Sequence, residues 1–457
     1  MKNLIKSLLI CLLSMSLVLS ADASEQTTKD VADDQLNIQE VVIENGLRVI
    51  VVNMKSNGSV TFGVGYLVGA GDDPRDVVGI SHFLEHMMFA GTKNISEDKL
   101  KEVIGKYNKD TNAFTSYDIT FYHHKCNKVF LDIDMAIEAD RMQNLKLDKK
   151  LIEREKNVII EERKMRVESH PLSKFMYEAA FKAMFLYSTY SYPVIGYLDQ
   201  IKNCNKQKLE NHYKTFYSPQ NAFIVFVGDI TMDEALKKVR KYFGSISSSA
   251  PVKRERVIDP QNIGLKFTID NSSDQITIKN FNMIFKIDRD LIKTLKDESV
   301  IELIVGMLCS GRSSILYKTL VDQKELAYTL DSLLDIRAYD KGRVNIATVI
   351  REGVSYTVIE KEIEEIVYNF ADKYLTKELL ETEKLKVLNK IELAQDSPDD
   401  MQMLILTNLC NGRTLEEIKN IKNIVKKITF EEVKAKAKEF LNKENKMLRI
   451  YSNPKEK

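Results

Sequence analysis

The chain has 457 residues, of which 44% are hydrophobic and 29% are charged. This composition supplies enough apolar side chains for a large buried core and excludes an intrinsically disordered protein. Lysine and arginine number 67 and aspartate and glutamate number 66, so the formal net charge is +1. A protein that wraps nucleic acid or binds a membrane surface through a polybasic patch would carry a charge excess, so neither class is expected.

The first 23 residues have the pattern of a secretory signal peptide. Lys2 and Lys6 give the positive start, an apolar run follows at 8–19, and Ala-Asp-Ala at 21–23 is a small-residue cleavage pattern. The run is too short and too often interrupted by serine for a comfortable transmembrane helix, and an N-terminal membrane anchor is the alternative interpretation. We therefore expect a periplasmic or otherwise exported protein with no stable membrane span after signal removal.

Strand and helix signals divide the rest of the chain into two halves. Residues 24–37 are polar and expected to be flexible, and residues 246–262, with three serines and two prolines, are typical of a linker. The halves are then 38–245 and 263–457. Strands are predicted at 48–53, 59–68, 115–123, 222–228, 266–276, 327–335, 343–350 and 446–451. Helices are predicted at 79–90, 153–167, 172–185, 211–217, 232–243, 299–309, 313–323, 356–374, 377–394 and 431–441. Each half ends on a helix followed by a strand, which indicates two α+β halves of similar plan.

The most informative motif is His82-Phe83-Leu84-Glu85-His86, inside the predicted helix 79–90. The spacing i, i+3, i+4 places His82, Glu85 and His86 on one face of the helix. Two imidazoles one turn apart can bind one tetrahedral Zn²⁺, which lowers the pKa of a bound water toward about 7. The glutamate lies beside the metal and can accept the proton of that water, as in the H-x-x-E-H order of inverzincins. Because two histidines and a carboxylate in a buried helix need partners, we expect metal binding rather than an uncoordinated pair.

A catalytic zinc site needs a third protein ligand and an open fourth position. The predicted helix 153–167 offers Glu155, Glu161 and Glu162. Glu155 and Glu162 are seven residues apart and share a face, whereas Glu161 points about 100° away from Glu162. The apolar residues 158–160 indicate that one side of this helix is buried. The spacing therefore favours Glu162 as the ligand, with Glu161 as the alternative and an ordinary charged surface helix as the interpretation without a metal.

The run GISHFLEHMMFAGT at 79–92 resembles the zinc-site helix of the pitrilysin/insulinase-type metallopeptidases, and is most similar to their processing-peptidase-like branch. Matched residue by residue, the resemblance implies Zn²⁺ as the cofactor, held by His82, His86 and Glu162. It implies Glu155 as a catalytic-site residue behind the ligands and Glu85 as the general base. The implied fold class is α+β, with two homologous halves, each a mainly antiparallel sheet packed with helices, forming a clamshell around a peptide chamber.

Residues 111–116, TNAFTS, are similar to the family strand that pairs with the substrate backbone. The resemblance implies that Asn112 and Ala113 contact the peptide substrate. Physically, an exposed edge strand captures an extended peptide through main-chain hydrogen bonds with little demand on sequence. A core strand with one polar face is the alternative interpretation. The histidines that match no ligand position are expected to be structural or surface residues; they are His123, His124, His170 and His212.

The second half contains one departure from the family pattern. Residues 310–328 resemble the segment in which the family places an arginine and a tyrosine seven residues apart, where they bind substrate and stabilise the oxyanion. Tyr328 fits the tyrosine, but Val321 stands at the arginine position. A valine cannot donate a hydrogen bond, and loss of an oxyanion donor costs about 3–4 kcal/mol in barrier. Arg312 is a less favoured substitute. Family members of this length often work in pairs, so we expect a related zinc-less partner subunit that carries the Arg/Tyr pair.

Two functions from different classes fit these residues. The leading one is an exported zinc endopeptidase that hydrolyses peptides or unfolded segments, and the other is a peptide-binding or assembly subunit with a structural or vestigial zinc site. A zinc hydrolase of another substrate class is a third, weaker hypothesis. A structural site has no use for Glu85, so the two main functions differ in what Glu85→Gln should do to hydrolysis. The cysteines beyond the signal are far apart and expected to be packing residues; they are Cys126, Cys204, Cys309 and Cys410.

Overall fold

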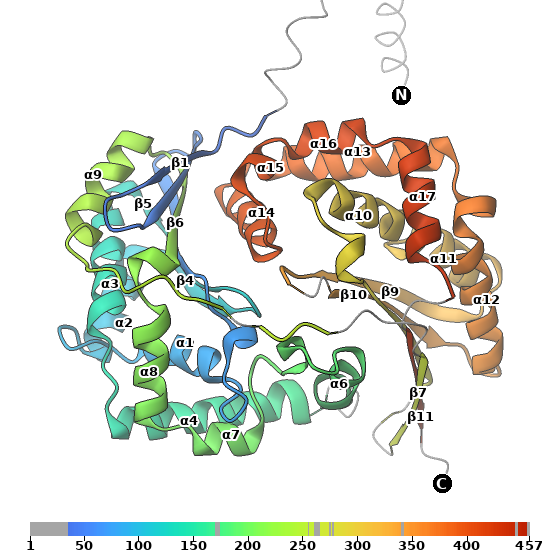
Figure 1. Ribbon diagram of the computed structural model, residues 1–457, viewed down its shortest axis with the longest axis horizontal. Coiled ribbons are helices and arrows are strands. Elements are labelled where there is room, and N and C mark those ends of the chain that lie inside the picture. Colours follow the sequence, from blue (N-terminus) through green and yellow to red (C-terminus); the bar gives the residue numbers. More distant parts are fainter. Residues whose placement is uncertain are drawn as a thin grey trace, which may run out of the picture. The chain divides into compact units, whose positions relative to one another are not determined.

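A computed structural model of the protein describes residues 35–169, 174–254, 256–259, 266–273, 276, 278–339, 342–443 and 447–454. The expected signal peptide, most of the segment 24–37, His170 and parts of the expected linker lie outside these residues. From Leu36 onward the chain forms one compact unit. It contains one sheet in each half, with helices packed against it (Figure 1).

The sheet of the first half has six strands in the order β1-β2-β6-β3-β5-β4. Their bounds are β1 (Gln39–Val42), β2 (Arg48–Asn53), β3 (Ser59–Tyr66), β4 (Asn108–Thr115), β5 (Thr120–Asn127) and β6 (Ala222–Gly228). Neighbours are antiparallel except β2 and β6, which are parallel. The predicted strands at 48–53 and 222–228 are confirmed, and β4 lies at an edge of the sheet.

The single strand predicted at 115–123 is wrong, because the chain reverses direction inside it. β4 ends at Thr115 and β5 begins at Thr120. In the turn between them, the Ser116 hydroxyl oxygen accepts hydrogen bonds from the backbone N–H groups of Asp118 (3.3 Å) and Ile119 (3.0 Å). Serine favours such turns because its short side chain bonds to nearby backbone. The flanking threonines and aromatic residues, which favour strands, concealed this turn in the sequence.

Most helices of the first half pack on one face of its sheet, whereas α6 (Phe181–Met184) packs against the sheet of the second half. Their bounds are α1 (Ile80–Phe89), α2 (Glu97–Tyr107), α3 (Leu131–Asn144), α4 (Lys149–Arg163), α6 (Phe181–Met184), α7 (Leu198–Asn203), α8 (Lys206–Phe216) and α9 (Met232–Phe243). A buried cluster joins Phe62 and Val64 of β3 to Phe83 and Leu84 of α1. The predicted helices 79–90 and 232–243 are confirmed as α1 and α9. α2 and α3 were not predicted, because their many charges weaken the apolar period.

The sheet of the second half has five strands in the order β7-β11-β8-β10-β9. The strands are β7 (Lys266–Ser273), β8 (Asn280–Lys286), β9 (Ala327–Ile336), β10 (Gly342–Ile350) and β11 (Met447–Pro454). The helices are α10 (Leu295–Cys309), α11 (Ile315–Tyr317), α12 (Tyr356–Asn369), α13 (Lys377–Ala394), α14 (Pro398–Cys410), α15 (Leu415–Lys419), α16 (Ile421–Lys427) and α17 (Phe430–Phe440). The predicted helix 377–394 is confirmed as α13, whereas α14, α15 and α16 were not predicted.

The two halves repeat one sheet topology. In each half the last strand lies between the first and second strands of a five-strand core, parallel to the first and antiparallel to the second. This describes β6 between β2 and β3, and β11 between β7 and β8. The edge strands β4 and β9 therefore correspond. The repeat, with antiparallel pairings in the majority, confirms two homologous halves built on mainly antiparallel sheets.

The second face of the first-half sheet is covered by helices of the second half. Phe121 of β5 and Val225 of β6 belong to a buried cluster that also contains Ile405 of α14 and Ile418 of α15. β6 is consequently buried on both faces, which explains why residues 222–228 form an unbroken apolar run. The sheet that carries the edge strand β4 is thus held from both sides.

The four cysteines beyond the expected signal peptide form no disulfide within the described part of the chain, and Cys204 and Cys309 are buried. Among the described residues, no helix combines the length and the apolar character needed to cross a bilayer.

Candidate metal centre

The N-terminus of α1 is fixed by a buried carboxylate. Asp73 accepts hydrogen bonds from the backbone N–H groups of Gly79 (2.7 Å) and Ser81 (3.2 Å) and from the Ser81 hydroxyl (2.6 Å). His212 of α8 lies 2.9 Å from the same hydroxyl oxygen. A negative charge at this end of a helix is favourable because unpaired N–H groups point toward it. The helix that carries the histidines therefore starts at a defined place.

Gly79 precedes α1 with φ of +97°, a conformation that other residues adopt only with strain. A Cβ at this position would lie 2.6 Å from Cα of Gly196. The segment before α7 therefore packs directly on the backbone at the start of α1. This close contact explains why glycines stand at both positions.

The structure brings His82 and His86 of α1 together with Glu162 of α4. Oε2 of Glu162 lies 3.1 Å from Nε2 of His86 and 3.7 Å from Nε2 of His82. The histidine rings are 4.7 Å apart between centroids. Glu161 points elsewhere: its side chain is 66% exposed and pairs with Lys164. Of the two acids that the spacing left open, Glu162 is the one beside the histidines.

These three side chains fit a zinc ion. One ligand atom from each lies within 4.8 Å of the others. Ligands at about 2.0–2.1 Å from a tetrahedral zinc are about 3.3 Å apart, close to the observed separations. Oε2 of Glu162 is buried and yet makes no hydrogen bond to any residue in the described ranges, although two ring nitrogens are near it. At a metal site the ligand atoms converge on one point with their lone pairs and do not hydrogen-bond to one another. The three side chains have this arrangement.

The electrostatics of the two histidines differ. Burial, assisted by the nearby His86, lowers the pKa of His82 to about 4. Burial also disfavours the charged form of His86, but the nearby carboxylates of Glu155 and Glu162 outweigh it and raise the pKa of His86 to about 9. The site therefore combines a neutral imidazole with a protonated one, and His86 would have to release its proton to hold a metal.

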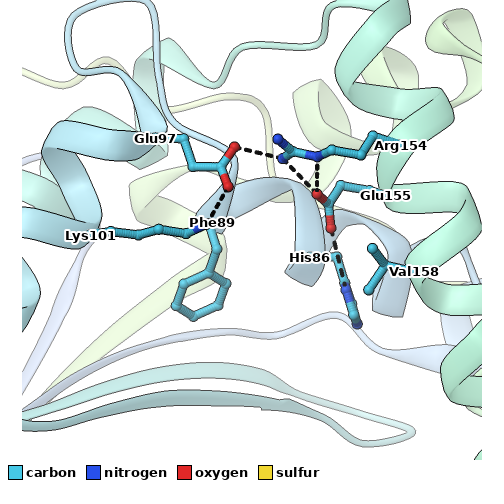
Figure 2. Close-up of a pocket in the computed structure, with 7 residues that line it drawn as sticks. All are labelled: His86, Phe89, Glu97, Lys101, Arg154, Glu155 and Val158. Carbon is cyan, nitrogen blue, oxygen red and sulfur yellow. Dashed lines mark hydrogen bonds and ion pairs between the residues drawn. The ribbon is translucent and has the colours of Figure 1, made fainter.

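Glu155 stands behind His86 on the same face of α4 as Glu162. Its Oε2 is 3.7 Å from Nδ1 of His86. Arg154 holds the other oxygen, with Nη2 and Nε at 2.7 and 2.9 Å from Oε1 (Figure 2). A carboxylate on the far nitrogen of a ligating histidine fixes the ring orientation and its tautomer. Glu155 is placed for that role.

Glu85 projects from α1 between the histidines and the edge strand β4. Its Oε2 accepts a hydrogen bond of 2.6 Å from the Thr115 hydroxyl. Burial raises the pKa of Glu85, and the Thr115 hydrogen bond opposes this rise. A carboxyl group with a raised pKa beside a metal site is a competent proton carrier at neutral pH.

A pocket of about 420 Å³ opens beside His86. Figure 2 shows its lining residues, which come from α1, α2 and α4 and are His86, Phe89, Glu97, Lys101, Arg154, Glu155 and Val158. Glu97 connects Lys101 and Arg154, at 2.6 Å from each. The pocket thus reaches His86, one of the three metal-binding side chains, from the α2 side.

The residues expected to contact substrate lie in both halves. Asn112 is exposed on the edge strand β4, and Ala113 packs partly against the core that contains α1. Tyr328 is 50% exposed near the start of β9, the corresponding edge strand of the second half. Val321 packs against the second-half core. Arg351, which follows β10, stacks its guanidinium 5.1 Å from the centroid of the Tyr328 ring.

Sequence reasoning missed Thr115, Asp73, Arg154 and Arg351. Their partners are 30, 8, 1 and 23 residues away in the chain. Only Arg154 lies within helical reach of a predicted site residue, so its charge next to Glu155 was a usable signal. Thr115 and Arg351 meet their partners through sheet pairing, which needs the strand register. The other three described histidines stay outside the metal group: His124 pairs with Glu138, His212 lies beside Ser81, and His123 is partly buried on β5.

The chain is similar in sequence to known zinc proteases and processing peptidases. Residues 48–195 match the family described as "Insulinase (Peptidase family M16)", and residues 203–387 match "Peptidase M16 inactive domain". The zinc protease PqqE of Helicobacter pylori is 26% identical over 357 residues, which are 78% of this chain and 79% of that protein. The mitochondrial-processing peptidase subunit beta of Bos taurus is 30% identical over 229 residues, which are 49% of this chain and 46% of that protein.

Solved structures show the same fold. The crystal structure of a protease from Helicobacter pylori superposes with a TM-score of 0.83 at 23% sequence identity, over 91% of this chain and 99% of that one. The likeness confirms the expected fold class. Two consecutive M16 domains occupy most of the residues between 48 and 387, and the relatives include both zinc proteases and processing peptidases. The chain therefore belongs to the pitrilysin/insulinase family, peptidase family M16, in its processing-peptidase-like branch.

Proposed function

We propose that the protein is an exported zinc-dependent endopeptidase that hydrolyses peptides or unfolded segments. The observation that carries this proposal is the convergence of His82, His86 and Glu162 with Glu85 directly beside them. A structural zinc site needs ligands only. A carboxylate with a raised pKa, held next to the ligands by its own hydrogen bond, is what a hydrolytic site requires in addition.

His82, His86 and Glu162 would hold the ion, and Glu155 would orient the His86 ring from behind. When bound, zinc supplies a Lewis acid that polarises the substrate carbonyl and activates water. Glu85 does the proton transfer: it accepts a proton from the attacking water and delivers it to the nitrogen of the leaving amine. Its raised pKa keeps the protonated form accessible for the second transfer.

The substrate is proposed to lie along β4, beside Asn112 and Ala113. β4 is an edge strand, so an extended peptide can add to the sheet through main-chain hydrogen bonds. Thr115, at the end of β4, contacts Glu85, so this strand leads to the catalytic carboxylate. Recognition through the backbone suits unfolded segments, because most backbone groups of a folded protein are already paired within its own helices and sheets.

Export and a partner subunit belong to the same proposal. Export is supported by the signal-like pattern of residues 1–23. A zinc-less relative is supported by Val321, an apolar residue that packs in the second-half core and cannot donate to an oxyanion. Arg351 over Tyr328 is the candidate cation within this chain. Adding a co-encoded relative of similar length to the purified chain should raise kcat/KM if the partner supplies the missing donor.

The alternative function is a peptide-binding or assembly subunit with a vestigial zinc site. Two observations favour it: Val321, and the match of residues 203–387 to a domain described as inactive. Under this alternative, the metal site persists without a catalytic purpose for Glu85.

The deciding experiment measures cleavage of a quenched fluorescent peptide by wild type and by Glu85→Gln, with zinc content determined on the same samples. We expect chelator-sensitive hydrolysis by the wild type, alone or with the co-encoded relative. Glu85→Gln should retain zinc and lose at least about 10²-fold in kcat. Zinc-loaded wild type that binds peptide without cleaving it, in the presence of its relative, would support the binding subunit instead.

A further inference from the structure

We propose that Thr115 is a positioning residue, which sets the Glu85 carboxylate in its working orientation and ties it to the strand that binds substrate. The inference rests on the proposed function, because it concerns the general base of that reaction. The direct observation is the 2.6 Å hydrogen bond from the Thr115 hydroxyl to Oε2 of Glu85.

The strand geometry directs Thr115 toward the metal site. Side chains alternate between the two faces of a strand, so Thr111, Ala113 and Thr115 share one face of β4. Ala113 packs against the buried cluster that contains α1, whereas Phe114 packs against the cluster on the opposite face. Thr115 therefore faces α1 because of the register of the whole strand.

The two segments that carry the partners of this hydrogen bond are fixed to each other. The turn after Thr115 is tied to the segment before α1, because the backbone N–H groups of Ala70 and Gly71 donate to the carbonyls of Ser116 (3.0 Å) and Tyr117 (2.8 Å). A Cβ on Gly69 would lie 2.4 Å from the Ser116 carbonyl oxygen, so the two segments are in direct contact. The end of β4 and the start of α1 consequently move together, which keeps the donor and the acceptor in place.

The hydrogen bond gives the two carboxylate oxygens of Glu85 different roles. Oε2 accepts the Thr115 hydroxyl, so Oε1 is the oxygen that remains to take the proton from water. A glutamate side chain in several rotamers would spend only part of its time in reach of that water. Thr115 also stabilises the charged form of Glu85, which makes the base weaker rather than stronger. Its benefit must therefore come from orientation, and the effect should appear in kcat rather than in KM.

The experiment compares Thr115→Val with Thr115→Ser. Valine has the shape of threonine without the hydroxyl, and serine keeps the hydroxyl without the methyl group. We expect Thr115→Val to lower kcat by about 10- to 100-fold with KM within about threefold of wild type. Thr115→Ser should retain kcat within about threefold, because the donor is restored. Thr115→Ala, judged by the same criteria, replaces the valine variant if that variant does not fold.

A second readout does not depend on activity. Crystal structures of the metal-free variants should show Glu85 in the wild-type rotamer in Thr115→Ser and displaced in Thr115→Val, with zinc binding unchanged in both. Combined with Glu85→Gln, Thr115→Val should cost little further activity, because it acts through the residue already removed.

The inference is overturned if Thr115→Val keeps kcat within about threefold of wild type, or if the serine and valine variants lose kcat equally. It is also overturned if the Glu85 rotamer is the same in both crystal structures. These outcomes differ from a failure of the proposed function, in which zinc-loaded wild type shows no chelator-sensitive hydrolysis with or without its relative.

Discussion

Two adjacent acids on α4 have opposite environments. Glu162 is 13% exposed and faces both histidines, whereas Glu161 is 66% exposed and pairs with Lys164. Because an exposed ion pair contributes at most about 1 kcal/mol, the site does not depend on Glu161. A difference of one residue along the helix thus separates a metal-facing carboxylate from a surface charge.

We expect Glu162→Gln to lower zinc affinity by at least about 10²-fold, because an amide oxygen replaces a charged ligand. Glu161→Gln is the matched control and should bind zinc like the wild type. Competition with a calibrated chelator measures both. If the two variants lose zinc equally, or if only Glu161→Gln loses it, the assignment of the third ligand is wrong.

At the scale of elements, α1 depends on a chain of polar groups at its N-terminus. The Ser81 hydroxyl donates to Asp73, so the nearby ring nitrogen of His212 acts as the donor to Ser81. Burial lowers the pKa of His212 to about 3. The folded protein therefore contains a neutral His212 at pH values where the unfolded chain, with a histidine pKa of about 6.5, is protonated.

Stability should consequently depend on pH through His212. As pH falls below about 6.5, the unfolded state binds a proton that the folded state does not, so the free energy of unfolding falls by up to about 1.4 kcal/mol per pH unit. His212→Gln lacks this group. We expect the stability advantage of wild type over His212→Gln, measured by chemical unfolding, to shrink as pH decreases from about 6.5 to about 5.

Above about pH 7.5 the difference in free energy of unfolding between wild type and His212→Gln should be constant, because His212 is neutral in the folded and the unfolded state. Groups far from His212 titrate alike in both proteins and cancel in the comparison. Asp73, whose pKa burial raises to about 7, is linked to His212 through Ser81, so its titration is separated by repeating the comparison in an Asp73→Asn background. A difference that stays the same across the whole range would mean that His212 takes up a proton as readily in the folded state as in the unfolded chain.

Helices and strands in which apolar residues recur at a regular spacing were predictable from the sequence. The site residues that lie on α1 were predictable as well. His82, Glu85 and His86 share a helical turn, so their spacing alone puts them together. The third ligand needed the docking of α4 on α1, which spacing could only suggest. The Thr115 contact was not predictable, because the strand signal at 115–123 hid the hairpin that places Thr115 at the end of β4.

At the scale of the molecule, the two halves are joined next to the segments that position the site. Arg256, which follows the first half, donates to Asp72 just before α1 at 2.7 and 3.1 Å, and also bonds to Asp118 in the turn after β4. Its guanidinium lies 4.3 Å from the ring centroid of Tyr339 in the second half. A residue of the expected linker is thus a buried anchor.

Arg256→Met should lower the free energy of unfolding by about 3–5 kcal/mol, because the nearly buried carboxylates of Asp72 and Asp118 lose the cation that they share. Lys93→Gln, an exposed change in the first half, should stay within about 0.5 kcal/mol of wild type. Chemical unfolding of the three proteins measures both values. Asp118 lies in the turn that fixes Thr115, so the arginine variant should also lose kcat at temperatures where it remains folded. A loss of less than about 1 kcal/mol would show that water or another cation neutralises these carboxylates, and that the linker does not anchor the two halves.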